Sequence, residues 1–530
     1  MQIIKEEINK TNRVISTPSE NTHTLCLNDY LIKDNQDCLV IYHALVEGFE
    51  ECERAVQPHV NVFSLFFHHL MRILSGYILK KNELLGPYKP SKEVLDFPVN
   101  RFPYINYMEI LNNVDYESKD YSLVKDDNPY IKRKLISFLS RSLKPFGKGS
   151  IGILSNTLFN RDLVLGLIRN GYQVQFLHDF KISVDYLDIQ LKLISECINK
   201  IFINLCIANS PEPVIEIIKR HIITSVAENN NIRIDCDAII AGSMNELINC
   251  SYGAISRLSG IPMISIMHGE GDQLLFNEPV FGYGDRTYPS VLFGFGPGPL
   301  EGIKDGKYLR SLYDQPEYMT SNSNFIKRIY NNDNVVPIKN HAKMKWMYVP
   351  DSIRYHHRYG PFAGNIPPQL YLQWQRTLLN SFDNIIYKRH PKGHSLFRKL
   401  TNNNLKNLLV PHSNDILFTS ENFYNIYEQC DGYIFDHIST AFTVASATDK
   451  PIIYFNIGKR NFTDYAEKII RERCLWLDVD PANPGDLREQ IESKQNKPYT
   501  NSITTNFSLD DSNPHLSRDH KLLNTIKSIV

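Results

Sequence analysis

Two turns in the last third of the chain carry side chains that could bind a phosphate group. The first turn follows the apolar run NIIY and contains Lys388, Arg389 and His390. The second follows the run GYIF and contains Ser439 and Thr440 at the expected start of a helix. Ligands bind at the carboxyl ends of the strands in an open parallel sheet, and a helix N-terminus attracts anions through its free N–H groups and its dipole. We therefore predict that the two turns form half of a nucleotide-binding site.

The residues next to these turns sharpen their predicted roles. Pro391 disfavours helix at His390, so the imidazole should point off the end of the strand, among cations that suit a phosphate or a leaving nucleotide. Asp436 precedes Ser439 and Thr440, and all three are candidates for binding the ligand. The alternative is that these three only cap the helix, although capping and phosphate binding are compatible.

A third candidate group lies in the sequence MHGEGD. It contains His268, Glu270 and Asp272 after an apolar run that predicts a strand, and its two glycines permit a tight turn. A neutral imidazole at this place could remove a proton from an acceptor hydroxyl as that hydroxyl attacks. The alternative is that His268 hydrogen-bonds the backbone and shapes the turn. Asp235 and Asp237 precede another strand, where we expect a turn or contact with solvent rather than a carboxylate nucleophile.

Aromatic and basic side chains also alternate in residues 351–362, DSIRYHHRYGPF. This tract follows the first strand expected in the second half of the chain. It could cover a base or a sugar, or it could form a solvated loop. We expect Trp374, further along the chain, to lie in the core.

These turns need parallel strands to position them, and short apolar runs alternate with helical patterns in residues 146–300 and again in residues 343–495. Strands of the first stretch are expected near residues 150–156, 236–246, 261–272 and 289–298, the last of which closes the sheet. Right-handed crossovers make the strands of each stretch neighbours in a parallel sheet. The sequence therefore predicts two Rossmann-like domains, with the two phosphate-binding turns in the second.

The remaining segments show no such alternation. Residues 1–145 are predicted to be a mainly helical extension, in which residues 62–79 form a helix that packs on the body of the protein or, alternatively, rests on a membrane surface. Residues 301–342 are polar and irregular, and we expect them to pass between the domains. Residues 496–530 are predicted to be a loosely packed C-terminal tail with one closing helix.

The composition narrows the class of protein. The chain has 530 residues, too many for a single core, and its 58 Lys plus Arg balance 58 Asp plus Glu, so no global field recruits nucleic acid or an acidic membrane. Its nine cysteines are scattered without a CxxC pair, which favours buried free thiols over disulfides or a zinc site. The first residues have mixed charges and no apolar core, so we expect no secretory signal and a cytoplasmic protein.

Three of these motifs resemble motifs of GT-B glycosyltransferases that build bacterial surface polymers. KRHP at residues 388–391 matches the K-x-H-P turn of that family, and KPII at residues 450–453 matches K-P-I/V-I/V. DHIST at residues 436–440 matches an acidic turn that ends in Ser-Ser or Ser-Thr before a helix, although it departs from the D-Y-S-S of the teichoic acid group. The nearest pattern is the group that contains CDP-glycerol glycerophosphotransferases and capsule transferases using CMP-activated sugars such as Kdo or sialic acid. In the teichoic acid group a His-Gly pair is implicated as the catalytic base, and His268 followed by a glycine matches it.

The resemblance implies an α/β protein of the GT-B fold, with two Rossmann-like domains facing across a cleft. It implies a metal-independent glycosyltransferase that moves a sugar from a nucleotide-activated donor, preferably a CMP-linked acidic sugar, to a growing bacterial surface polysaccharide such as capsule or O-antigen. Its partners would be the nucleotide-sugar donor and a glycan or lipid-linked glycan acceptor, with no nucleic acid and no further cofactor. The residues that would hold the donor are Lys388, Arg389, His390, Asp436, Ser439 and Thr440.

Three other functions stay open at this point. The chain could be a CDP-glycerol-type glycerophosphotransferase, or a hydrolase or epimerase that consumes a nucleotide sugar without an acceptor glycan. It could also be a non-catalytic factor in polysaccharide assembly. Peripheral contact with the cytoplasmic face of the inner membrane is compatible with each of them.

Overall fold

The structure, a computed structural model, describes the chain from residue 148 to residue 529 apart from several gaps, together with five earlier positions. The five positions are Val62, Leu65, Phe66, Leu70 and Leu74. The gaps after residue 148 are 155–160, 178–182, 185, 205–209, 227–233, 243–246, 268–287, 299–315, 321, 331–335, 337, 339–341, 352–367, 390–405, 407–408, 411–415, 460–461, 495–498, 501, 508 and 510–517.

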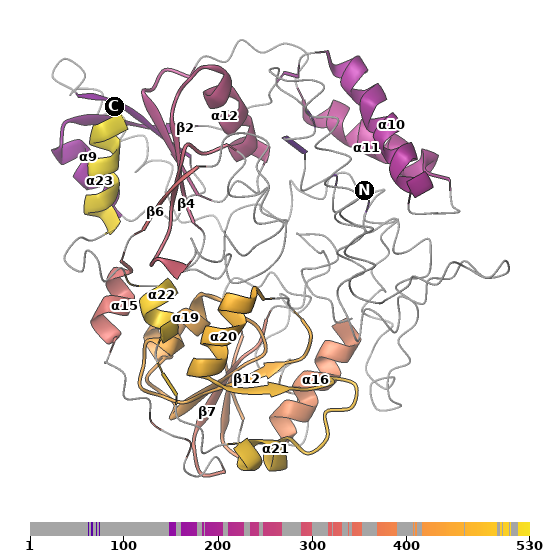
Figure 1. Cartoon of the computed structure of the whole chain (residues 1–530), viewed down its shortest axis with the longest axis vertical. Helices are drawn as coiled ribbons and strands as arrows, with labels where there is room; N and C mark the ends of the chain where they lie inside the picture. The colour runs from indigo at the N-terminus through magenta and orange to yellow at the C-terminus, as the bar shows by residue number, and fades with distance from the viewer. Residues whose placement is uncertain are drawn as a thin grey trace.

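The first domain is built, in its described residues, on six parallel strands in the order β2-β1-β3-β4-β5-β6 (Figure 1). The strands are β1 (Gly149–Leu154), β2 (Tyr172–Leu177), β3 (Ala238–Ala241), β4 (Met263–Ile266), β5 (Val291–Phe293) and β6 (Glu317–Met319). β3 has the sequence AIIA and is buried at all four positions, as expected in a parallel sheet that helices cover on both faces. The apolar runs thus form strands where the sequence predicts them.

Helices connect these strands, and two of them cover the sheet. They are α9 (Arg161–Arg169), α10 (Leu187–Asn204), α11 (Glu212–Ser225) and α12 (Leu247–Leu258). α9 packs on one face of the sheet through Val164 and Leu167, which join the core around β1 and β3. α12 covers the other face, where the Ser256 hydroxyl contacts the Met263 sulfur at 3.9 Å.

One strand of this sheet was not predicted. β6 pairs with β5 in parallel, beyond the strand near residues 289–298 that the sequence indicates as the last, and it lies in the stretch that we expected to pass between the domains. The sequence EYM is only three residues long and partly exposed, so it shows neither an apolar run nor an alternation. Tertiary pairing alone makes it a strand.

The second domain has, among its described residues, another six parallel strands, in the order β10-β9-β7-β11-β12-β13. The strands are β7 (Trp346–Val349), β9 (Ile385–Lys388), β10 (Leu417–Thr419), β11 (Gly432–Phe435), β12 (Ile452–Asn456) and β13 (Leu475–Asp478). One face packs against α16 (Pro368–Asn380) and α21 (Leu487–Lys494). The opposite face packs against α15 (Asn324–Ile329), α18 (Phe423–Ile426), α19 (Thr440–Ser446), α20 (Asp464–Arg473) and α22 (Ser502–Phe507).

Local sequence explains how these elements begin and how closely they pack. The Thr463 side chain caps α20 by accepting a hydrogen bond from the Ala466 N–H, which satisfies one of the free donors at a helix start. Gly432 opens β11 because a Cβ atom there would lie 2.5 Å from the Trp346 ring. Only glycine therefore allows β11 to run beside β7 under that tryptophan.

The end of the chain returns to the first domain. α23 (Arg518–Ile529) buries Leu522 and Ile526 in the same core as α9, and Figure 1 shows the two helices side by side. α22 lies against α19 and α20 in the second domain. The sequence predicted one closing helix in a loosely packed tail; the described part of the tail has two helices, each packed into a different domain. This return depends on contacts across hundreds of residues, which no local pattern records.

The predicted fold class is confirmed: the chain is an α/β protein with two Rossmann-like domains, each built on its own parallel sheet. The described positions from Val62 to Leu74 are helical and buried, and the Phe66 ring meets the His221 ring of α11 edge-on at 5.7 Å. They support the predicted helix packed on the body, while the rest of residues 1–145 lies outside the described residues. No described helix is long and apolar enough to span a membrane.

The cysteines that the structure describes are free and buried, as predicted. They are Cys197, Cys236, Cys250, Cys430 and Cys474. Burial raises the pKa of the Cys236 thiol to about 11, and nearby Asp237 and Asp235 act in the same direction. These thiols therefore belong to the packing of the two domains.

Candidate functional site

The strand order of the second domain points to one edge of its sheet. Counted in chain order, its strands run 3-2-1-4-5-6, and the order reverses between β7 and β11. Ligands of such sheets bind outside the carboxyl ends of the strands at this switch point. Asp351 follows β7 there, and Asp436 and His437 follow β11. The candidate site is therefore this carboxyl edge.

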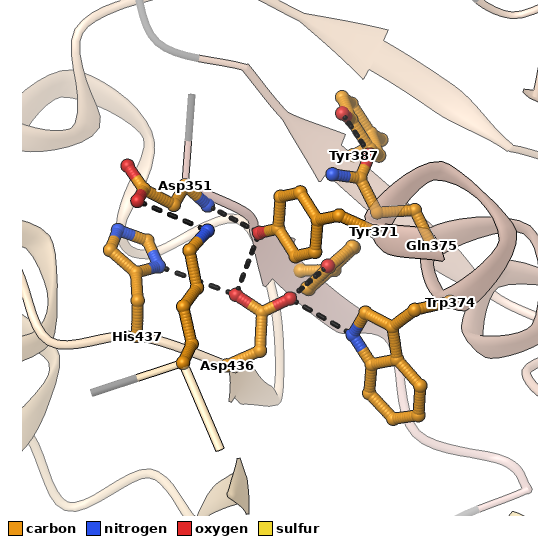
Figure 2. A network of polar contacts seen from close by, with 9 residues as sticks. Asp351, Tyr371, Trp374, Gln375, Tyr387, Asp436 and His437 are labelled. Carbon is orange, nitrogen blue, oxygen red and sulfur yellow. Dashed lines mark hydrogen bonds and ion pairs between the residues drawn. The ribbon is translucent and has the colours of Figure 1, made fainter. Parts of the chain in front are cut away.

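A fully buried carboxylate lies beneath that edge. Asp436 is 0% exposed, and one of its oxygens accepts hydrogen bonds from the Tyr348 hydroxyl at 2.5 Å and from the Trp374 indole at 3.0 Å. Its other oxygen accepts one from the Tyr371 hydroxyl at 2.9 Å. Figure 2 shows the Tyr371 and Trp374 side chains of α16 directed at Asp436, the residue that follows β11. The carboxylate is thus fixed from three directions.

The charge of Asp436 is maintained in spite of its burial. Burial by itself raises the pKa of this carboxyl, but the hydrogen bond from His437, the positive charge of Lys459 and the hydrogen bond from Tyr348 outweigh it, so the pKa lies below its ordinary value. Hydrogen bonds to the charged form favour that form. Asp436 is therefore an ionised anchor at neutral pH.

Two side chains extend from this anchor towards the edge of the sheet. The Nδ1 atom of His437 lies 3.4 Å from the second oxygen of Asp436, and the His437 side chain is 10% exposed. The Tyr371 hydroxyl, which donates to Asp436, also accepts the backbone N–H of Asp351 at 2.8 Å. One buried carboxylate thereby holds the ends of both strands at the switch point.

An ion pair joins the ends of β7 and β12. The Lys459 ammonium group lies 3.1 Å from the Asp351 carboxylate and 3.6 Å from the centre of the Tyr371 ring. Gly458 precedes it with φ of +72°, a conformation that glycine adopts without strain. Because β11 lies between β7 and β12, this pair connects the two strands that flank the Asp436 turn.

The first predicted donor-binding turn is described at two positions. Lys388 ends β9 and is 3% exposed, and its ammonium group donates to the carbonyl oxygen of Arg389 at 2.5 Å. Burial, together with the positive charge of Arg389, lowers the pKa of Lys388 to about 8, while Glu421 acts in the opposite direction. Arg389 is half-buried, and its N–H donates to Thr419 at the end of β10. The structure therefore gives Lys388 a role in shaping the turn, and its contact with a donor stays a prediction.

The second predicted turn lies between β11 and α19. Ser439 is the N-cap residue of α19, and its side chain makes no capping hydrogen bond. Ser439 and Thr440 are both half-buried. The Ser439 hydroxyl therefore does not cap the helix, which was the alternative to ligand binding. Asp436 does not cap the helix either, because its carboxylate is directed into the core; the structure makes it a positioning residue, and its direct contact with a ligand stays a prediction.

Other candidate residues lie outside the described residues or at a different edge. His268, Glu270, Asp272 and His390 are not among the described residues, so their predicted roles stay predictions. The Asp237 carboxylate accepts the Ser150 N–H at 2.6 Å at the amino end of β3. Asp235 and Asp237 are both exposed, so the contact with solvent that we expected there is confirmed.

The sequence missed most of the Asp436 network. Trp374 was expected in the core and is there, with 0% exposure, but its bond to Asp436 was not foreseen. Tyr371 and Lys459 were not candidates, although a lysine directly after the glycine that ends the PIIYFNIG run was a usable signal. In the part of the chain that the structure describes, no group of three or more His, Cys, Asp or Glu side chains could hold a metal ion.

Comparisons with known proteins give similarity to solved structures alone. No protein-family model matches the chain, and no curated protein matches it. The structure of Phytolacca americana UGT2 complexed with UDP-2fluoro-glucose and pterostilbene aligns over 74% of this chain and 95% of its own, with 10% identity and a TM-score of 0.33. The crystal structure of a glycosyltransferase from Rickettsia africae ESF-5 aligns over 75% and 94%, with 12% identity and a TM-score of 0.34. Likeness at this level says nothing of the reaction.

Proposed function

We propose that this chain is a glycosyltransferase that takes its sugar from a nucleotide-activated donor. One observation carries the proposal. Three motifs spread over residues 388–453, on which the resemblance to GT-B transferases rests, fall on the strands of one parallel sheet. KRHP begins at the end of β9, DHIST spans the turn from β11 to α19, and KPII leads into β12. Two of these motifs meet the carboxyl edge where such a sheet binds nucleotides.

The charges at that edge suit a phosphorylated donor. Arg389 and Lys459 are basic residues at the ends of β9 and β12, and phosphate oxygens bind most strongly to charged donors of this kind. Cations in this position also stabilise the charge that develops on a leaving phosphate. Donor phosphate would thus be neutralised by side chains, and the proposed reaction needs no metal ion.

The finer parts of the proposal follow from the resemblance of the motifs. The donor would be a CMP-linked acidic sugar, and the acceptor would be a growing bacterial surface polysaccharide such as capsule or O-antigen, free or lipid-linked. His268, with Glu270 and Asp272 near it in the sequence, would take the proton of the attacking hydroxyl. The protein would work in the cytoplasm, at or near the inner face of the inner membrane.

The test begins with binding. Thermal unfolding of the pure protein would be followed with CMP, CDP, UDP and GDP, each with and without EDTA. We expect stabilisation by at least one of these nucleotides, unchanged by EDTA, and a smaller effect in Arg389→Gln. Arg488→Gln is the matched control, because its partly exposed side chain pairs with Asp383 ahead of β9, at the opposite edge of the sheet.

Activity is then measured with the activated sugars themselves. The protein would be incubated with a synthetic acceptor and with CMP-Kdo, CMP-sialic acid or CDP-glycerol, and the products analysed by mass spectrometry. Mass added to the acceptor supports the transferase, and its size names the donor group. Stabilisation by none of the nucleotides, or consumption of a donor without any change in any acceptor, would refute the proposal.

A further inference from the structure

The buried network of the second domain reaches the edge of the sheet through the imidazole of His437. Asp436 holds Nδ1 of that ring, and Tyr348, Tyr371 and Trp374 hold Asp436. Since the carboxylate is ionised, Nδ1 is the protonated nitrogen of the pair. Among the described residues the other ring nitrogen, Nε2, has no hydrogen-bond partner. The ring is therefore held in one orientation with Nε2 available to a ligand.

Charged groups from three elements lie around the ring. Asp436 follows β11 and Asp351 follows β7, and the Lys459 ammonium group, after β12, lies 3.1 Å from the Asp351 carboxylate. The other ionisable groups of the network, Tyr348 and Tyr371, have pKa values raised well above their ordinary value by burial and by Asp436, and stay neutral. An anion bound at Nε2 therefore meets a ring whose Nδ1 atom is already held by a carboxylate.

The position of the His437 ring in the sheet supports a contact with a ligand. His437 follows β11, one of the two strands at the switch point of the sheet, and Figure 2 shows its ring beside Asp351 and Asp436. A ligand bound at this edge meets an imidazole whose orientation is fixed from below. A ring held by an ionised carboxylate on one side binds anionic or polar groups on the other through a charge-assisted hydrogen bond.

We infer that His437 contacts the phosphate of the nucleotide ligand, donating its Nε2 proton in a hydrogen bond while Asp436 holds Nδ1. The inference rests on the proposed function, because it assigns a residue to the same nucleotide site. Asp436 acts through His437 and is a positioning residue. The contact involves no covalent step, and the proton stays on the ring.

The test separates the phosphate from the rest of the nucleotide. Affinity is measured by calorimetry or ligand-observed NMR for CMP against cytidine, and likewise for UDP against uridine, in the wild type, in His437→Gln and in His437→Lys. The glutamine offers only an uncharged N–H donor, whereas the lysine donates from a cation. Arg488→Gln again serves as the control, and tryptophan fluorescence and thermal unfolding show that each variant is folded.

A contact with phosphate predicts a selective loss. His437→Gln should weaken the nucleotide about tenfold, the effect of one lost charge-assisted hydrogen bond, and leave the nucleoside within about twofold. His437→Lys should recover most of the nucleotide affinity. Equal losses for nucleotide and nucleoside, or no loss for either, would overturn the inference while the nucleotide site itself stands. A wild type that binds none of the nucleotides would overturn both this inference and the proposed function. If one variant does not fold, the other decides between these outcomes.

Discussion

Replacing Asp436 with alanine should unfold the second domain selectively. The substitution leaves three buried donors, the hydroxyls of Tyr348 and Tyr371 and the Trp374 indole, without their acceptor. Each unsatisfied donor costs about 1–3 kcal/mol, or about 3–9 kcal/mol together. The variant no longer has to desolvate a charge, which offsets part of that loss. We therefore expect the free energy of unfolding to fall by about 3–5 kcal/mol, as when one partner of a buried pair is removed.

The protein contains a reporter for this domain. Its three tryptophans, Trp346, Trp374 and Trp476, all lie in the second domain, so tryptophan fluorescence in a urea titration follows that domain alone. Asp383→Ala is the control, because this aspartate is 60% exposed and pairs with Arg488 at 2.6 Å. An exposed pair is worth less than about 1 kcal/mol. A loss in Asp436→Ala no larger than in the control would refute the reasoning.

Acid provides a second check on the same variant. The pKa of Asp436 is lower in the folded protein than its ordinary value of 3.8. Its charge therefore stabilises the fold above pH 3.8, and this contribution is lost as the pH falls through the lower folded-state value. The difference in unfolding free energy between wild type and Asp436→Ala should be largest at neutral pH and shrink below pH 3.8. A difference that stays constant with pH would show that the charge contributes nothing.

Three further substitutions test the rest of the framework. Ile526→Ala removes a fully buried side chain from the first domain and should lower the free energy of unfolding by about 2–5 kcal/mol. Unfolding followed by circular dichroism should then begin earlier, while unfolding followed by tryptophan fluorescence stays unchanged; in the control Lys527→Ala both signals should match the wild type. Gly458→Ala puts a side chain at φ of +72° with nothing within 4 Å of it, so only backbone strain of about 1–2 kcal/mol should appear in urea unfolding, and less in Gly458→Asn. Lys459→Met leaves the Asp351 carboxylate without its 3.1 Å partner and should lower stability by about 1–3 kcal/mol; a thermal midpoint equal to that of the wild type would contradict the role of this ion pair.

Local sequence was sufficient to predict the strands that carry the site. β9, β11 and β12 are apolar runs that end in polar turns, and each lies where its run predicted it. A strand that is buried on both faces of a parallel sheet has a continuous apolar sequence, and the residues of the turn come immediately after the end of that strand. Lys388 and Ser439 could therefore be placed near the carboxyl edge from sequence alone.

The interactions beneath the site could not be predicted in the same way. Tyr348 lies 88 residues from Asp436 and Tyr371 lies 65 residues from it, and nothing in either local sequence distinguishes these tyrosines from others in the core. β6 and the packing of α23 on the first domain were not predicted for the same reason, because pairing with β5 and contact with α9 decide their place. Chemistry at strand ends is visible in short patterns, whereas the support beneath it depends on the fold.

The composition of the network argues that it positions a group rather than adding stability. Burying an ionised carboxylate costs several kcal/mol, and well-packed apolar residues of similar volume are often equally stable or more stable. A core built for stability could therefore place phenylalanine at the Tyr348 and Tyr371 positions and an aliphatic residue at Asp436. The charged arrangement fixes something that an apolar one cannot, the tautomer and direction of the His437 ring. Since that ring stands at the switch point of the sheet, where nucleotides bind, the cost of the buried charge is explained by what His437 contacts above it.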